Sequence, residues 1–344
     1  PIYLENIESP KQFPQLSDYS EILMKLLGSP NIASKIWVYG QYDHEVGIRT
    51  VTKPGYDASV LRLDNGKFLS IKIDGNPKQC YINPREGAIG CFEEACRNVV
   101  CTGAKPIGML DHLQFGNPND PEIFWTFLES LKGLTDFAKD FEIPCVGGKV
   151  SLYNETSDGP IKPTPVIGVI GLIDKKPLMI QKINSGDSLI MVGDTKDELG
   201  GSEYSEYIHK FIGGKCPAVD FSESKKNMNS VLDAIENELI KSAHDCSKGG
   251  LAIAISELCM INQIGCNVSL EKIPGEKLDS DKILFSESHS RYLLTIENKN
   301  LPKLEETMKK HNVSYSLIGE FTGNSICFTR DSKPIIDLSV DKAQ

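Results

Sequence analysis

The sequence predicts an α+β protein of two domains, a strand-rich domain followed by a domain in which strands and helices alternate. Apolar residues alternate over residues 58–63 and 68–73 and flank the tight-turn residues Asp64, Asn65 and Gly66, which predicts a β-hairpin. A helix with one apolar face is expected soon after the hairpin. From residue 188 on, the pattern predicts helices on one face of a mixed or antiparallel sheet. The apolar pattern restarts across the charged stretch 174–184, so we expect a linker or docking arm (1–34) and domains at 35–174 and 175–344.

Composition limits the classes of function. The chain has 344 residues, 40% of them hydrophobic, and a formal net charge of −10, with its basic residues dispersed among acidic ones. Nucleic acid is therefore not an expected partner. No apolar run approaches the roughly 20 residues that span a membrane, and the first residues lack a signal-peptide pattern, so we expect a cytoplasmic protein. The start at Pro1 suggests a processed protein or a piece of a longer one.

The ten cysteines form no CxxC pair and no regular framework, which predicts reduced residues of the core. Cys91, Cys96 and Cys101 are five residues apart, so a helix would turn them to different sides and they would not gather around zinc.

The stretch 74–118 is central to the prediction. Asn83 is placed to cap a helix, with Pro84 at its first position and Glu86 able to complete a capping box, and we expect the regular helix from about Gly87. Gly103 suits a left-handed residue at the C-terminal end. Small residues near the helix start would let an anion such as phosphate approach the N-terminus; close packing of helix on sheet explains them equally well.

Three residues before this helix are candidates for chemistry. Lys72 and Asp74 lie two apart on the predicted strand and so face the same side, where they suit phosphate and Mg²⁺, respectively; a solvated ion pair is the alternative. His44 lies between two acidic residues after a strand predicted at 35–42. A surface role fits His44 better than a catalytic one.

Further candidates follow the helix. Asp111 is near the end of a strand predicted at 106–115, where polar side chains would form a pocket rim. Gly147, Gly148, Lys149 and Ser151 are expected in a turn that would bring backbone, a cation and a hydroxyl to a ligand; an exposed turn without a ligand is equally consistent.

In the second domain, residues 242–250 are expected to open a helix over 251–260. Asp245 or Ser247 would cap that helix, which we favour over a catalytic pair of His244 with Asp245. A polar turn is expected at 287–289. The sequence contains no serine-hydrolase elbow, Walker loop, dinucleotide fingerprint or metalloprotease helix.

Several collinear motifs resemble one known family. IDGNPKQCYINPREGAIGCFEEACRNVVCTGAKPIGMLDHLQFGNP, PCVGGKVSLYNET, TPVIGVIGLI, LGGSEY, SAHDCSKGGLAIAISE and LFSESHSR are similar to the second half of phosphoribosylformylglycinamidine synthase, of the small multi-subunit type. KIWVYGQYDHEVGIRTV and PGYDASVLRL resemble the segment that leads into that half. The resemblance covers essentially the whole chain and extends to aminoimidazole ribonucleotide synthetases.

This resemblance implies half of a dimeric or pseudo-dimeric β-barrel with flanking helices, followed by an α+β sandwich domain. It implies an ATP-dependent ligase of purine biosynthesis, in which the amide oxygen of formylglycinamide ribonucleotide is activated and ammonia displaces it. The expected cofactors are ATP or ADP and Mg²⁺. The expected partners are the amino-terminal half, a glutaminase subunit and a small bridging subunit.

By position, the family's ATP contacts fall on Asp111 and Gly148, and a substrate contact falls on Ser151. Its magnesium-binding asparagine is replaced by Lys149, which cannot ligate a metal. Lys72 and Asp74 match nucleotide and metal positions of the other half, whose catalytic histidine this chain lacks. We therefore expect a chain that is inactive alone and that homodimerises. The alternatives are a nucleotide-binding scaffold and a self-sufficient synthetase such as a selenophosphate synthetase.

Overall fold

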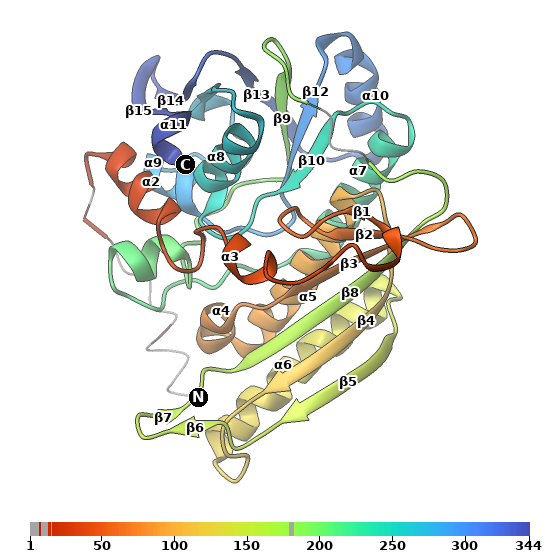
Figure 1. The fold of residues 1–344 in the computed structure, drawn as a ribbon. Coiled ribbons are helices and arrows are strands. Elements are labelled where there is room, and N and C mark those ends of the chain that lie inside the picture. The colour runs from red at the N-terminus through yellow and green to blue at the C-terminus, as the bar shows by residue number, and fades with distance from the viewer. Residues whose placement is uncertain (1–6, 8–12, 15, 179–181) are drawn as a thin grey trace.

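The computed structural model describes residues 7, 13–14, 16–178 and 182–344. It contains two large sheets, one in each half of the chain, and a small two-stranded sheet (Figure 1). The helices are α2 (Tyr19–Leu27), α3 (Ile36–Tyr39), α4 (Pro77–Ile82), α5 (Pro84–Cys101), α6 (Pro121–Phe141), α7 (Phe221–Glu236), α8 (Gly250–Asn262), α9 (Ser280–Phe285), α10 (Leu301–His311) and α11 (Val340–Ala343). The α+β prediction is confirmed.

The first sheet has the strand order β1-β2-β3-β8-β4-β5. Its strands are β1 (Thr50–Thr52), β2 (Ser59–Arg62), β3 (Phe68–Asp74), β4 (Lys105–Gln114), β5 (Cys145–Ser151) and β8 (Thr164–Ile173), and β6 (Glu155–Thr156) and β7 (Gly159–Pro160) form the small sheet. The predicted hairpin is β2–β3, closed by a hydrogen bond from Leu63 N to Lys67 O at 2.8 Å. β4 and β5 are parallel, and β5 is an open edge.

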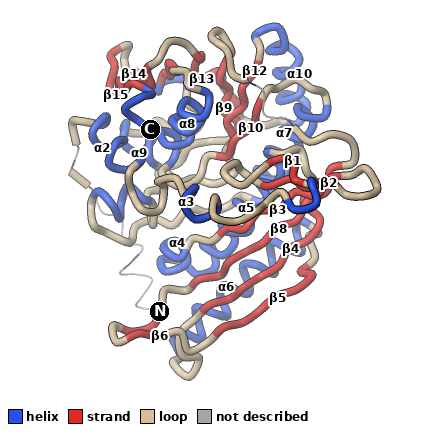
Figure 2. Tube along the Cα trace, viewed as in Figure 1, coloured by secondary structure: helices blue, strands red, loops and turns tan. Residues whose placement is uncertain are grey.

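Helices α5 and α6 cover one face of this sheet, as Figures 1 and 2 show. The predicted cap is confirmed, because Glu86 N donates to Asn83 Oδ1 at 3.1 Å, and Gly103 adopts φ +84° beyond the C-terminal end. The helix begins at Pro84, and not near Gly87, since Pro84 already has the fixed φ of a first helical residue. Between β3 and α5 lies α4, which is capped by Asn76.

The second sheet has the order β10-β12-β9-β13-β11-β14-β15. Its strands are β9 (Ser188–Val192), β10 (Ser242–Asp245), β11 (Cys266–Ser269), β12 (Tyr292–Ile296), β13 (Tyr315–Phe321), β14 (Ser325–Arg330) and β15 (Lys333–Ser339), with β11–β14 the parallel pair. The prediction that helices cover one face is wrong. Ile190 and Val192 pack in a core with α7 and α10, whereas Leu189 and Met191 pack in a second core with α8 and α2.

Two local predictions are wrong. Residues 35–42 were expected as a strand but contain the short helix α3. In the described part of the chain no strand pairs with this segment, and the apolar residues of α3 are exposed. Gly147 and Gly148 lie inside β5 and not in a turn, because β4 supplies a parallel partner. Farther along the chain, Tyr204–Ile208 forms a π-helical turn.

Part of the predicted arm 1–34 lies outside the described residues, and its described helix α2 buries Ile22, Leu23 and Leu26 in the second core. All ten cysteines are free, and eight of them are buried; Cys145 is exposed and Cys327 half-buried. In the described part of the chain, we find no helix that is both long and apolar enough to cross a membrane.

Candidate functional site

The structure divides the predicted site residues into two groups and leaves His44 outside both. Asp111, Gly148, Lys149 and Ser151 lie on the neighbouring strands β4 and β5, which we call the sheet-edge group. Lys72 and Asp74 lie on β3 and face α5, between the two domains. Together with residues described below (Asp57, Arg97, Asn98, His244, Asp245 and Lys248), they form what we call the inter-domain group. Strand β8 separates β3 from β4, so the two groups are distinct.

The sheet-edge group is centred on Asp111 and Gly148, which are register partners in the parallel pair. A Cβ atom on residue 148 would lie 2.2 Å from Asp111 Oδ1, so glycine leaves room for that carboxylate. Asp111 Oδ2 lies 3.8 Å from Cys145 Sγ, and partial burial raises the pKa of the Asp111 carboxyl. Gly148 therefore lets the Asp111 carboxylate lie close to the backbone of β5, although the predicted turn is absent.

Lys149 and Ser151 lie farther along the same edge. Lys149 is exposed and follows Gly148, so its side chain leaves the opposite face of the strand. Ser151 Oγ lies 3.4 Å from Asn154 Oδ1, and Asn154 Nδ2 donates to Phe115 O at 3.0 Å, which holds the loop after β5 against the end of β4. The hydroxyl is thus at the rim of the sheet, where it is half-buried.

Lys72 and Asp74 confirm the predicted shared side. Lys72 Nζ donates to Asn98 Oδ1 of α5 at 3.0 Å, and Asp74 interacts with Glu94, one turn earlier on the same helix. Burial lowers the pKa of Lys72, but the negative charges of nearby carboxylates outweigh burial and raise it. Burial raises the pKa of Asp74, and the cations Lys248 and Lys72 outweigh it, so that Asp74 is held ionised.

The inter-domain group includes residues that the sequence did not assign to a site. His244 contacts Asp57 (Nδ1 to Oδ1, 2.8 Å) and Glu257 (Nε2 to Oε2, 3.1 Å). Burial lowers the pKa of His244, but Asp57 and Glu257 outweigh it and raise the pKa well above its ordinary value. Asp57 is 187 residues away in sequence, so only the motif PGYDAS marked it.

The expected capping by Asp245 or Ser247 is wrong. Residues 242–245 form β10 because they pair with β12, and α8 begins later with Gly249 as its N-cap. Asp245 Oδ2 instead accepts hydrogen bonds from Arg97 Nη2 at 3.2 Å and Asn98 Nδ2 at 3.1 Å. The cap was predicted from the spacing of residues close together in the sequence, whereas the partners of Asp245 lie on α5 of the other domain.

The residues of the expected polar turn at 287–289 are buried. Glu287 Oε1 accepts hydrogen bonds from the backbone N–H groups of Glu203 and Gly249, each at 2.8 Å. The Glu287 carboxylate, which belongs to the motif SESHSR, therefore forms hydrogen bonds to backbone groups of the motifs LGGSEY and SKGG. Burial, together with the charge of Arg97 and other cations, lowers the pKa of neighbouring His289 to about 3, so this imidazole is neutral.

At the inter-domain group, the expected Mg²⁺ would compete with donors that the carboxylates already have. Asp57, His244 and Asp245 have ligand atoms within 4.8 Å of one another. However, Asp57 Oδ1 already interacts with His244 Nδ1 and accepts a hydrogen bond from the Asp245 N–H, and Asp245 Oδ2 accepts from Arg97 and Asn98. Asp74 is likewise occupied by Lys248 Nζ at 3.5 Å and by Gly75 N at 2.7 Å.

Two cavities adjoin these groups. A cavity of about 750 Å³ has Asp57, Lys72, Asn98, His244 and Asp245 in its wall, together with apolar residues of α2 and α8. A shallower one of about 470 Å³ lies between β4, β5 and the end of α6, and Asp111 and Cys145 line it. His44 lines neither cavity, and its Nδ1 lies 3.1 Å from Tyr42 O.

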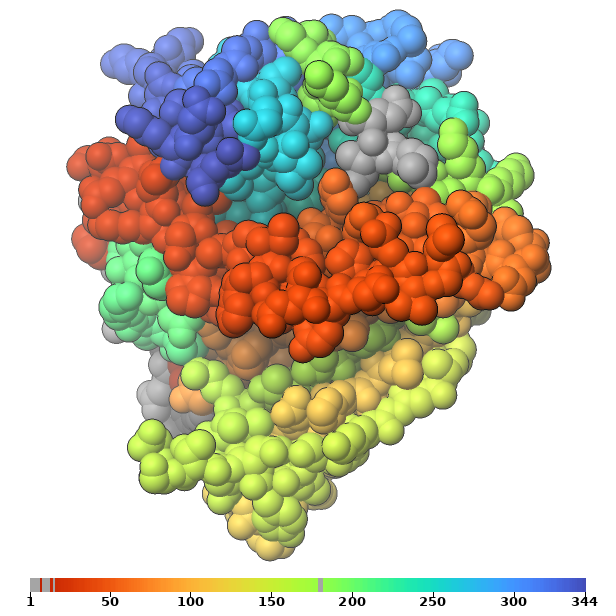
Figure 3. Space-filling model, viewed as in Figure 1, coloured from red at the N-terminus to blue at the C-terminus, as the bar shows by residue number. Residues whose placement is uncertain are grey.

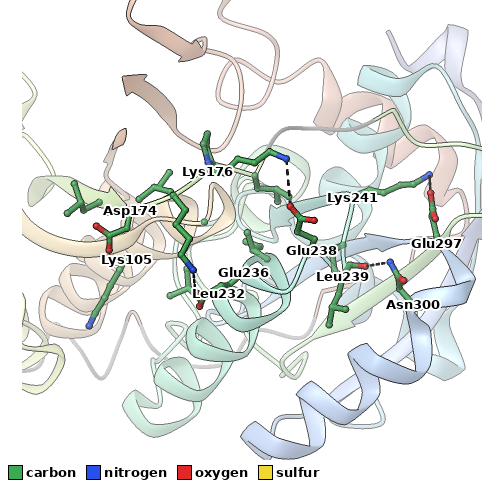
Figure 4. Close-up of a pocket in the computed structure, with 18 of the residues that line it drawn as sticks. Lys105, Asp174, Lys176, Leu232, Glu236, Glu238, Leu239, Lys241, Glu297 and Asn300 are labelled. Atoms are coloured by element: carbon green, nitrogen blue, oxygen red, sulfur yellow. Dashed lines mark hydrogen bonds and ion pairs between the residues drawn. The ribbon is translucent and has the colours of Figure 1, made fainter. Parts of the chain in front are cut away.

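A third cavity, of about 760 Å³, lies away from the predicted residues, between the domain connection and the end of α7 (Figure 4). Two of its lysines are paired with its acids: Lys176 Nζ lies 3.8 Å from Glu238 Oε1, and Lys241 Nζ lies 3.5 Å from Glu297 Oε1. Size alone therefore does not identify the functional cavity here.

Comparison with known proteins identifies the family. The models of the N-terminal and C-terminal domains of AIR synthase related protein match residues 55–173 and 184–329, respectively. The chain belongs to the AIR synthase related family. The first matched range contains the strands of the first sheet except β1, and the second contains those of the second sheet except β15 and the last residue of β14, so the order of the two domains is that of the family.

Among curated proteins, the chain is similar to phosphoribosylformylglycinamidine synthase subunit PurL. It is 44% identical to PurL of Methanocaldococcus jannaschii over 94% of this chain and 45% of that protein. It is 41% identical to PurL of Thermococcus sibiricus over 96% of this chain and 46% of that protein. The chain thus spans less than half the length of these relatives.

Solved structures show the same fold. Thermotoga maritima PurL complexed with FGAR has a TM-score of 0.77 at 19% identity, covering 96% of this chain and 54% of that chain. The ATP complex of the same protein has a TM-score of 0.74 at 18% identity, covering 96% and 52%.

Proposed function

We propose that this chain is one half of an ATP-dependent ligase that converts formylglycinamide ribonucleotide and ammonia to formylglycinamidine ribonucleotide in purine biosynthesis. The observation that carries the proposal is the 44% identity to a PurL subunit over 94% of the chain. In the reaction, ATP gives its terminal phosphoryl group to the amide oxygen. Ammonia then attacks the amide carbon and phosphate leaves, so the products are the amidine, ADP and phosphate.

The sheet-edge group would supply contacts to ATP and substrate. Asp111 and Gly148 are adjacent, the glycine leaves space above the carboxylate, and the Ser151 hydroxyl lies at the rim of the same edge. T. maritima PurL has been solved with FGAR, ATP, ADP and AMPPCP, which supports a nucleotide and this substrate for the family. Lys149 leaves the opposite face of β5, so its ammonium group, which cannot ligate Mg²⁺, would place a charge on phosphate from that face.

We propose that the remaining parts of the active site come from an amino-terminal half, and that ammonia comes from a glutaminase subunit docked with a small bridging subunit. The solved structure of PurLQS from T. maritima supports a multi-subunit arrangement. The chain covers only 45% of its M. jannaschii relative, which leaves about half of the enzyme to another segment or chain. The His44 region would then face that partner, and any catalytic role of His44 would require it.

The surface opposite α5 suits such a partner. Ile73, Gly168, Leu110 and Gly147 are register neighbours across four strands, and Ile73 is 66% exposed. Beside the sheet, the red-orange segment of residues 30–60 forms a ridge across the molecule in Figure 3, and its exposed apolar residues include Ile36, Trp37, Val38, Tyr42, Val46 and Ile48. Exposed apolar patches of this kind mark interfaces.

In the absence of the other half, this surface would pair with a second copy of the chain. Light scattering of the isolated chain is then expected to give twice its mass, and Leu110→Asp to shift it toward the monomer. A monomeric wild-type chain at micromolar concentration would contradict this part of the proposal.

A second candidate function is that of a nucleotide-binding scaffold. The paired charges of the inter-domain group favour it, because its carboxylates already have cationic partners, whereas phosphoryl transfer relies on metal ions that neutralise the developing charge. In that case nucleotide would stay bound through gel filtration without turnover.

The test is complementation. The chain is assayed with ATP, Mg²⁺, formylglycinamide ribonucleotide and ammonium, with and without a separately produced amino-terminal half, and formation of the amidine is measured. We expect activity only with both halves. Activity of this chain alone would indicate a self-sufficient synthetase, whereas a stable complex without activity would favour the scaffold.

A further inference from the structure

The first sheet has an open face, opposite α5 and α6, and this face is turned toward the viewer in Figure 1. Where β4 and β5 end, strand register places three rows of residues on it, each row crossing β8, β4 and β5 in that order. Members of successive rows are two residues apart along each strand, so all three rows share the open face. The first row is Gly168, Leu110 and Gly147, the second is Val166, His112 and Lys149, and the third is Thr164, Gln114 and Ser151.

The first row forms a shallow floor. Gly168 and Gly147 have no side chains, and they lie on either side of Leu110, which is 42% exposed. The nearest atoms to a Cβ added at either glycine belong to Leu110, at 3.7 or 3.8 Å, which is ordinary contact distance. The described part of the chain therefore leaves space above this floor, which suits a flat, partly apolar part of a ligand such as a sugar ring.

The second and third rows contain bases and hydrogen-bonding groups but no acid. His112 and Lys149 are register partners, and so are Gln114 and Ser151, and we call these four residues the polar corner. Among the described residues, the side chains of His112, Gln114 and Lys149 have no hydrogen-bond or ion-pair partner. Their donors are therefore available to a ligand on the open face.

The carboxylate that comes closest along the chain lies on the other side of the sheet. Asp111 precedes His112 on β4, so its side chain leaves the opposite face, where it lines the cavity of about 470 Å³ beside α6. The Asp111 carboxylate interacts with the backbone N–H of Lys149. The charge of the Lys149 ammonium group thus remains for an anion on the open face.

We infer that the polar corner binds the phosphate group of a phosphorylated ribose, with the sugar lying on the floor of the first row. An ammonium group, an imidazole, an amide and a hydroxyl supply several donors, which matches the several acceptor oxygens of one phosphate. The inference rests on the proposed function for its choice of ligand, because formylglycinamide ribonucleotide and ATP both contain a phosphorylated ribose. It adds His112 and Gln114 to the contact already proposed for Lys149.

The site is tested by calorimetry of the full chain with ribose 5-phosphate and, separately, with ATP, each in excess EDTA so that no metal ion contributes. The wild-type chain is compared with Lys149→Met, Lys149→Arg and His112→Gln. The matched control is Lys105→Met, which removes the same charge from an exposed lysine at the other end of β4. Circular dichroism melting checks that each variant is folded.

We expect the wild-type chain to bind at least one of the two ligands, and Lys149→Met to weaken that binding about tenfold, because it removes a hydrogen bond between charged groups. His112→Gln should weaken it less, because glutamine retains a donor, and Lys149→Arg should restore most of the affinity. The control should stay within about twofold of the wild type. An absence of binding, or equal affinities of Lys149→Met and the control, would overturn the inference.

The kinetics of the complemented enzyme identify the source of the phosphate. Lys149→Met should raise the KM for formylglycinamide ribonucleotide if the polar corner holds the substrate phosphate, and the KM for ATP if it holds a nucleotide phosphate. An active variant with both KM values unchanged would overturn the inference. If the complemented wild type forms no amidine, the proposed function fails, whereas the titrations of the isolated chain still decide whether the polar corner binds phosphate.

Discussion

Replacing Arg97 with methionine is expected to destabilise the protein more than any replacement of a surface ion pair. Arg97 is fully buried on α5, where it pairs with Glu93 of its own helix and with Asp245 of the other domain. Methionine fills similar space but leaves both carboxylates buried without their cation. Breaking a buried pair in this way costs about 3–5 kcal/mol, because a charge remains without compensation.

The matched control is Arg85→Met. Arg85 lies on the same helix and pairs with Asp136 of α6, but the two side chains are 40% and 42% exposed. Water screens such a pair, so its loss should cost about 0–1 kcal/mol. The difference between the two variants therefore isolates burial of the charges, because both changes remove an arginine from α5.

The assay is urea unfolding followed by circular dichroism at several values of pH. Burial already raises the pKa values of Glu93 and Asp245, and Arg97 opposes this rise. Without Arg97 both folded-state pKa values rise further above those of the unfolded chain, so the folded variant binds protons more readily than the unfolded one. The stability deficit of Arg97→Met should therefore be largest at high pH and shrink as the pH falls through the raised pKa values.

A deficit equal to that of Arg85→Met would refute the reasoning. So would a large deficit that is the same at all pH values, because it would indicate lost packing and not a charge left unpaired. Since folded proteins are typically stable by about 5–15 kcal/mol, the expected loss is measurable without abolishing the fold of a protein near the middle of that range.

Three further predictions follow from single contacts. Gly148→Ala should force the Asp111 carboxylate to move from its position 2.2 Å from the new Cβ, and so lower kcat/KM of the complemented enzyme while changing its melting temperature little; unchanged kinetics would exclude Asp111 from the ATP contacts. His244→Gln should flatten the decline of stability with rising pH. The folded-state pKa of His244 is raised, so the protonated imidazole stabilises the wild-type chain below pH 6.5, and this stabilisation is lost as the pH rises through the folded-state pKa. Equal melting curves of both proteins from pH 6 to 10 would contradict the prediction. Asn83→Ala should cost about 1 kcal/mol in urea unfolding through loss of the cap on Glu86 N, and no change would mean that water replaces the cap.

Local patterns predicted the elements that local forces determine. The hairpin β2–β3, the cap of α5 at Asn83 and the left-handed Gly103 follow from alternation, turn chemistry and capping, all of which act within a few residues. The stretch 35–42 failed because an apolar run fits a strand or a helix equally well, and the absence of a pairing strand decided the outcome.

The candidate site divides in the same way. Lys72 and Asp74 were predicted to share a face, because strand alternation determines it. The contacts of Asp245 with Arg97 and of His244 with Asp57 were missed, since each joins residues far apart in sequence and on different domains. Spacing along the chain contains no signal for such pairs, although the motifs PGYDAS and SAHDCSKGG contain the residues concerned.

Helix α5 has a consequence for how the chain can be divided. One continuous core contains Val99 and Phe92 of α5, Val169 of the first sheet, and Val231 and Tyr292 of the second domain. Cutting the peptide chain between the two matched ranges would therefore break the covalent connection but leave the two folded domains packed together. We expect limited proteolysis there to leave a nicked protein that migrates as one particle and melts in one transition, and either fragment expressed alone to expose half of a shared interior and aggregate.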